Sequence, residues 1–166
     1  MSYVKYTTTP KKIRFYFSTT TLYERISETT AHKAVLLSSM EKGADFDLVA
    51  VSADENSIIK KYIEEAMLEI FSPLEKIMTG SMGFDETFTP PGGSETTGYF
   101  GDVTDNEKGR EITLQALSKI MENAIVDFCV YRWYILRGLS DDAQAHYVAF
   151  GNGLRRIMEL SMVLWI

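Results

Sequence analysis

Histidine and cysteine are scarce in this 166-residue chain, which has only His32, His146 and Cys129. One cysteine cannot form an internal disulfide, so nothing in the chain requires an oxidising compartment. No cysteine pair has zinc-binding spacing, and no H-E-x-x-H motif or glycine-rich phosphate-binding loop occurs. Cys129 follows Phe128 in an apolar segment, which favours a buried thiol over a nucleophile. We therefore expect no catalytic residue, no cofactor-binding residue and no metal site, and hence no enzyme.

Long apolar runs are also missing. The most apolar stretch, residues 124–136, contains Asp127 and Arg132 and is shorter than the roughly 20 residues that cross a membrane. Residues 1–14 have no apolar core of the kind found in secretory signals. The formal net charge of −6 is unsuited to many contacts with nucleic-acid phosphates. The composition thus predicts a soluble, intracellular protein without a membrane partner.

Charge is distributed unevenly along the chain. Residues 1–23 carry four cations and no acid, whereas residues 45–107 carry fourteen acids and three lysines. The acidic run is interpreted either as a set of solvated helix faces or as a surface that lets an anion pass without binding. Glu64, Glu65 and Glu69 lie off an apolar stripe at helical spacing, and no lysine follows any of them by four residues. We expect these three glutamates to face a channel lumen or another open acidic surface.

Helix signals dominate the rest of the chain. Segments of the S/T-x-x-E form, which cap helix N-termini, begin at Thr21, Ser52 and Thr104. Together with apolar residues at helical spacing, they predict four helices over residues 21–40, 52–71, 105–137 and 140 onward. The two-residue link Gly138-Leu139 favours an antiparallel αα-hairpin between the last two. Residues 13–17 predict a short strand, and residues 46–51 a brief extended stretch.

The segment Met78–Thr104 differs from its surroundings. It holds six of the eleven glycines and two of the four prolines, yet it also carries four aromatic rings. A pure linker would lack such rings, and long structureless loops are uncommon in compact domains. We interpret the segment as a projecting arm or long hairpin that turns at Pro91-Gly92-Gly93, with rings ordered by a neighbouring subunit. A floppy surface loop is the alternative.

These signals predict a mainly α fold: a small bundle of about four helices, two of them long and paired as a C-terminal αα-hairpin, with a short N-terminal strand and a projecting loop or β-hairpin arm. Residues 1–20 are expected to form the N-terminal arm or strand, and residues 21–166 a helical domain with residues 79–104 as its projecting insertion. The side chains of residues 131–134, three of them aromatic, point around the whole circumference of the predicted helix, and residues 162–166 carry no charge. Both segments are therefore expected to be buried in the chain's own core or by a partner. The predicted subunit or partner contacts are Phe84, Phe88, Tyr99, Phe100, Trp133, Trp165 and Ile166.

Several segments, in a fixed order, resemble one protein family. They are the capped helix Ser52-Ala53-Asp54-Glu55 … Tyr62-Ile63-Glu64-Glu65-Ala66, the glycine-rich insertion, the helix end Val130-Tyr131-Arg132-Trp133-Tyr134, and the turn into Asp142-Ala143-Gln144-Ala145-His146-Tyr147-Val148-Ala149-Phe150. From about Ser52 to Ile157, this pattern resembles the head–tail connector (adaptor or neck ring) proteins of tailed bacteriophages.

The resemblance implies a structural virion protein at the head–tail junction, assembled in the host cytoplasm. The subunit would be small and mainly helical and would form a homo-oligomeric ring of about a dozen copies. Portal and tail proteins, or neighbouring rings, would be its partners, and DNA would pass through the lumen without sequence-specific binding. The family has no catalytic motif to carry over.

Two other functions are compatible with the residues. One is a soluble helical partner-binding or regulatory protein without enzymatic activity, monomeric or dimeric, which a size measurement would distinguish from a ring component. The other is a small hydrolase or transferase, which would need titratable groups that converge in a pocket.

Overall fold

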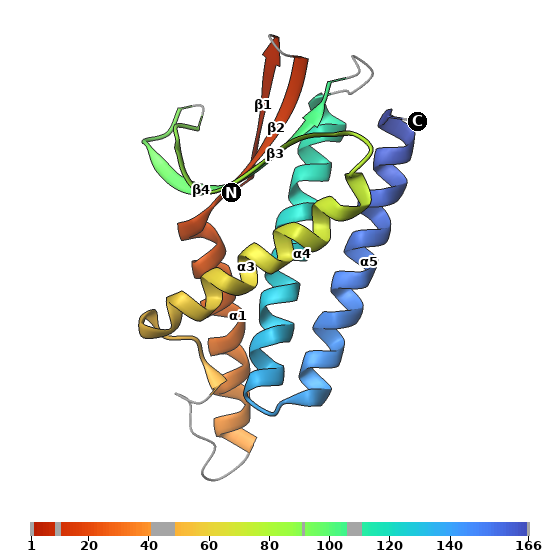
Figure 1. The fold of residues 1–166 in the computed structure, drawn as a ribbon. Coiled ribbons are helices and arrows are strands. Elements are labelled where there is room, and N and C mark those ends of the chain that lie inside the picture. The colour runs from red at the N-terminus through yellow and green to blue at the C-terminus, as the bar shows by residue number, and fades with distance from the viewer. Residues whose placement is uncertain (1, 9–10, 41–48, 91, 106–110, 166) are drawn as a thin grey trace.

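A four-stranded sheet lies at one end of a group of long helices in the computed structural model of this chain (Figure 1). The structure describes residues 2–8, 11–40, 49–90, 92–105 and 111–165. Its strands are β1 (Ser2–Thr8), β2 (Lys11–Ser18), β3 (Met78–Phe88) and β4 (Thr96–Thr104). Its long helices are α1 (Thr19–Met40), α3 (Asn56–Phe71), α4 (Glu111–Leu136) and α5 (Ser140–Trp165). Short 3₁₀ turns, Ala53–Glu55 and Ser72–Leu74, adjoin α3.

The sheet is larger than the sequence led us to expect. Its strand order is β1-β2-β4-β3, and every neighbouring pair is antiparallel. The predicted mainly α fold with one short strand and a projecting arm is therefore wrong, and the described chain has an α+β fold. The glycine-rich insertion supplies both β3 and β4, and β4 pairs with β2 on one side and with β3 on the other. The N-terminal region supplies a two-stranded hairpin rather than a single strand.

Glycines weaken the strand signal of the insertion in the sequence. In the structure they lie at positions where aromatic rings from other elements pack against the strand. The ring of Phe71, at the end of α3, occupies the space that a Cβ on Gly101 would need. Phe88 crosses over Gly98 and stacks on Tyr16 of β2, with ring centroids 4.3 Å apart. Glycine inside a strand often marks such a close approach. The sequence shows these glycines but not the rings that pack beside them, so the pairing of this segment with β2 in a larger sheet was not predicted.

The helices agree better with the predictions from the sequence than the strands do. The apolar stripe of α3 is buried, as predicted. Its members are Ile59, Ile63, Ala66 and Ile70, and Leu74 of the following 3₁₀ turn continues the stripe. The Ser52 amide donates to Glu55 Oε2 at 2.8 Å, so the predicted capping box forms. The αα-hairpin is also confirmed: α4 and α5 lie side by side, and Gly138 turns the chain with a φ of 76° (Figure 1).

Four local predictions failed or fall outside the described residues. Thr104, expected to cap a helix, is the last residue of β4, and the expected first turn over residues 106–110 is outside the described ranges. Of the extended stretch predicted at 46–51, only residues 49–51 are described, and they are not a strand. The helical spacing of the apolar residues predicts that Ile135 and Tyr147 lie on the inward faces of their helices, yet each is about half exposed.

Candidate interaction surfaces

An open groove runs between α3 and α5, with α4 as its floor. Its hollow has a volume of about 680 Å³. Leu68 of α3 and Tyr147 of α5 form its rims and are 55% and 51% exposed, while Phe128 and Tyr131 of α4 line its floor. The rings of Tyr131 and Tyr147 lie 5.1 Å apart, centroid to centroid. Large apolar side chains exposed together on one face are typical of a surface that contacts another macromolecule.

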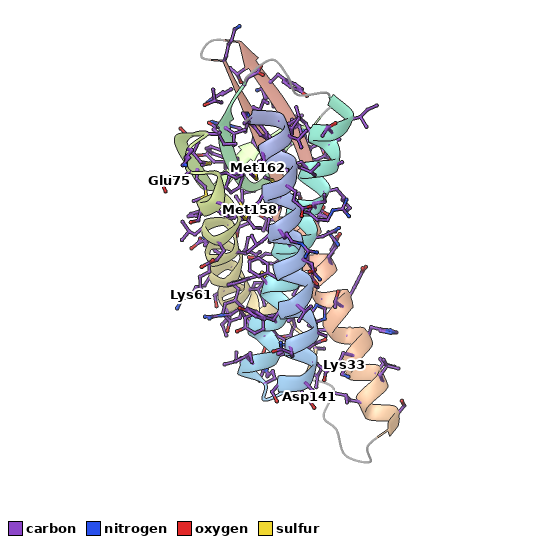
Figure 2. The ribbon with its side chains drawn as sticks, turned by 90° about the vertical axis from the view of Figure 1, so that its right-hand side faces the viewer. Lys33, Lys61, Glu75, Asp141, Met158 and Met162 are labelled. Carbon is purple, nitrogen blue, oxygen red and sulfur yellow. The ribbon has the colours of Figure 1, made fainter. Side chains whose placement is uncertain are left out.

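The exposed apolar surface continues along α5 towards its C-terminal end. Met158, Met162 and Val163 are all at least 46% exposed. Met158 and Met162 also line a smaller hollow of about 70 Å³ against Leu74 and Ile77. Figure 2 shows both methionines on the part of α5 nearest the chain that follows α3. Together with the groove, they extend the apolar surface along most of α5.

An ion pair joins the α3 wall of the groove to its α4 floor. Glu65 Oε2 of α3 lies 3.1 Å from Arg132 Nη2 of α4, and both side chains are partly exposed. The Arg132 guanidinium also lies 5.2 Å from the centroid of the Tyr62 ring. Burial raises the pKa of the Tyr62 hydroxyl, an effect that the Arg132 charge partly opposes. Arg132 thus ties α3 to α4 and neutralises one of the three glutamates singled out from the sequence.

The three glutamates therefore differ in their surroundings. Glu69 is exposed, whereas Glu64 and Glu65 are half-buried. No lysine follows these glutamates by four residues, but Arg132 from another helix lies beside Glu65. Lys60 and Lys61 also stand one turn before Glu64 and Glu65. That the three glutamates face a lumen stays a prediction. Glu64 and Glu69 are its better candidates, because Arg132 pairs with Glu65.

The aromatic residues predicted as partner contacts fall into three groups. Phe84 is the most exposed, at 37%, and meets Tyr99 edge to face at 5.9 Å. Phe88 and Phe100 pack on the outer face of the sheet against Tyr16 and are at least 92% buried. Trp165 is half-buried and donates its indole N–H to the Thr104 carbonyl. Ile166 lies outside the described residues.

Tyr99 and Trp133 are fully buried in this chain's own core, so neither offers a surface to a partner. The prediction that they make subunit contacts is corrected accordingly. Trp133 Nε1 donates to the Val49 carbonyl oxygen at 2.7 Å, and the Arg137 guanidinium lies 4.3 Å from its ring centroid. Arg137 in turn pairs with Glu55 in the capping box. Trp133 thus anchors the segment before α3 onto α4, a long-range role that spacing along one helix does not reveal.

A buried ion cluster on the sheet was not anticipated from the sequence. Asp102 of β4 is fully buried and accepts from Arg14 Nε at 2.6 Å, from Arg14 Nη2 at 2.7 Å and from Lys12 Nζ at 2.8 Å. Burial alone would raise the pKa of Asp102, but the hydrogen bonds from Arg14 and Lys12 hold it below its ordinary value. Arg14 also stacks on the Phe100 ring at 3.7 Å. The cross-strand pairing of Arg14 with Asp102 creates this cluster.

Three further titratable groups, His146, Tyr134 and Cys129, lie in structural contacts or buried positions. His146 Nδ1 lies 2.9 Å from Asp127 Oδ1, between α5 and α4. Burial raises the pKa of the Tyr134 hydroxyl to about 12. Burial also raises the pKa of the Cys129 thiol well above its usual value, which disfavours the thiolate that a nucleophile needs. Among the described residues, no group of three histidine, cysteine or acidic side chains is arranged to hold a metal ion.

Comparisons with protein-family models, with curated proteins and with solved structures find no match to this chain. None of the helices that the structure describes is long and apolar enough to span a membrane. The surfaces described above are therefore the basis for a functional proposal.

Proposed function

We propose that this chain is a structural subunit of a ring-forming head–tail connector, located at the head–tail junction of a tailed bacteriophage. The resemblance over residues 52–157 is one support. The observation that carries the proposal is the exposed apolar surface of α5 and of the α3–α5 groove, with Leu68, Tyr147 and Met162 each more than half exposed. Burying apolar area in an assembly contributes about 25 cal/mol per Å². A subunit that assembles with other copies exposes such a surface until its neighbours bury it.

The arrangement of the helices suits a ring in which different sides of the subunit have different tasks. The outer part of the β3–β4 hairpin and α5 lie on opposite flanks of the molecule, and α3 crosses the side between them (Figure 1). With its two flanks towards neighbouring copies, the subunit would turn α3 towards the lumen. Glu64 and Glu69 would then add negative charge to the channel wall, and a negative wall repels DNA phosphates and keeps the channel free of binding sites.

The mass and shape of the purified protein test the ring. Light scattering after size exclusion should give a multiple of 18.8 kDa that corresponds to a closed ring, and negative-stain images should show a central channel. A chain that stays monomeric over a wide concentration range would contradict the proposal. It would favour the alternative, a partner-binding protein that uses the same groove for a different protein.

The lumen assignment has its own test. The double variant Glu64→Lys with Glu69→Lys should retain DNA in a salt-dependent manner once assembled, because cations would line the channel. Glu65 stays unchanged, since a lysine there would face Arg132 and disturb the fold. Glu24→Lys with Glu28→Lys, on the exposed surface of α1, changes the net charge equally and is the matched control. Equal DNA retention by both double variants would show that α3 does not face the lumen.

A further inference from the structure

All charged residues of the segment that forms the β3–β4 hairpin are acidic. Residues 78–104 contain four acids and no lysine or arginine. Asp102 is neutralised within the sheet by Lys12 and Arg14. Glu86 of β3 and Glu95, just before β4, are exposed. With the partly exposed Phe84 ring nearby on β3, this end of the hairpin combines negative charge with an apolar group.

The exposed face of α5 has the complementary character. Arg155 and Arg156 are both exposed, and Arg155 Nε lies 3.9 Å from Glu159 Oε1, the one ion pair that Arg155 makes within the described ranges. Met162 and Val163 lie one to two turns further along the same helix and are 57% and 78% exposed. This face thus offers two guanidinium groups beside exposed apolar side chains. Arginine beside apolar residues is enriched at protein–protein contacts.

The opposite positions of these two surfaces determine what kind of assembly they can make. The hairpin and α5 lie on opposite flanks of one subunit (Figure 1). A contact between the hairpin of one copy and α5 of another uses two different patches, so each subunit keeps one patch free for the next copy. Such heterologous contacts close into rings when the rotation between copies allows it. Contacts between like patches would instead place Glu86 and Glu95, or Arg155 and Arg156, against their own copies, and like charges disfavour that arrangement.

We infer that the outer end of the β3–β4 hairpin of one copy docks on the α5 face of a second copy of this chain. Glu86 and Glu95 face Arg155 and Arg156 in this contact, and Phe84 packs among the exposed apolar side chains of α5. The inference rests on the proposed ring and specifies its subunit contact. It also explains why the hairpin carries acids without any cation, which the fold of a single copy does not require.

Charge reversal tests the contact by sedimentation velocity. The hairpin variant Glu86→Lys with Glu95→Lys, and the α5 variant Arg155→Glu with Arg156→Glu, should each weaken self-association by about tenfold or more, since each places like charges together. A mixture of the two variants should assemble again, because each reversed patch then meets an opposite charge on the other variant. The control Glu24→Lys with Glu28→Lys should associate like the wild type.

A crosslinking experiment detects the contact even when it is weak. Under mild oxidation, a mixture of the Phe84→Cys and Met162→Cys variants should give a disulfide-linked dimer, whereas either variant alone should give much less. Cys129 is fully buried and does not compete. If the wild type forms rings but neither charge reversal weakens them and no mixed dimer forms, the hairpin–α5 contact is wrong and the ring proposal stands. If the wild type stays monomeric and the two cysteine variants give no mixed dimer, both the contact and the ring proposal are wrong.

Discussion

Replacing Gly98 by alanine should destabilise this protein strongly, although the change adds a single methyl group. Gly98 lies in β4 opposite Ser18 of β2, and a Cβ there would overlap the Phe17 carbonyl oxygen and come within 2.9 Å of the Phe88 ring. β4 is hydrogen-bonded on both sides, so its backbone cannot move away without breaking a strand pair. The methyl group therefore has to push β4 away from the Phe17 backbone, which strains the β2–β4 pairing, and it also has to displace Phe88 from its stack on Tyr16.

The expected magnitude follows from these contacts. Overpacking of a filled site costs about 1–3 kcal/mol, and loss of an aromatic pair costs about 0.5–1.5 kcal/mol. Loss of chain entropy in the unfolded state offsets about 0.4–1 kcal/mol of this. We expect a net loss of about 2–3 kcal/mol, which lowers the Tm of a chain of this size by about 4–12 °C.

Gly151 is the matched control because the chemical change is the same. It lies in the exposed part of α5, and no described atom outside its own helix lies within 4 Å of a Cβ built there. Alanine is favoured over glycine in a helix interior by about 0.5–1 kcal/mol, so Gly151→Ala should raise the stability. Urea unfolding followed by circular dichroism measures both variants. A Gly98→Ala protein as stable as the wild type, or a Gly151→Ala protein less stable than it, would refute the role assigned to these glycines.

Two further predictions concern buried polar contacts. Asp102→Asn should cost about 2–3 kcal/mol at neutral pH, because it weakens three charge-assisted hydrogen bonds. The pKa of Asp102 is lowered in the folded state, so its stabilisation is present above the ordinary value of 3.8 and is lost as the pH falls below it; a difference between variant and wild type that persists unchanged at low pH would contradict the ion cluster. Trp133→Phe keeps the ring but removes the donor to the Val49 carbonyl, and we expect a loss of about 1–2 kcal/mol in urea unfolding. Unchanged stability would show that water or another donor replaces the indole N–H.

The sequence predicted the helices because helix formation depends mainly on neighbours three and four residues apart. The buried stripe through Ile59 and Ile63, the capping box at Ser52 and the turn at Gly138 are all local patterns, and all three appear in the structure. The predictions that Ile135 and Tyr147 are buried failed because burial depends on more than local spacing. Each has the spacing of an inward position, but whether a helix face is covered depends on the elements that pack there.

The sheet could not be read from local patterns, since its pairing joins distant segments. β4 pairs with β2, more than 75 residues earlier in the chain, and only this pairing places Asp102 beside Arg14 and Lys12. In the sequence, Asp102 is one acid in a long acidic run. The glycines of the insertion likewise favour a loop until Phe71 and Phe88 are seen to fill the space beside them.

The candidate surfaces divide in the same way. The amino-acid sequence by itself determined that the insertion is acidic and rich in rings, that α3 has charged positions off its apolar stripe, and that metal-binding and nucleophilic side chains are few. Only the tertiary structure decided that Trp133 and Tyr99 belong to the core, that Glu65 is paired with Arg132, and that α5 keeps an exposed apolar face. The physical reason is that composition and periodicity depend on the chain near each residue, whereas burial and ion pairing depend on which distant elements pack together.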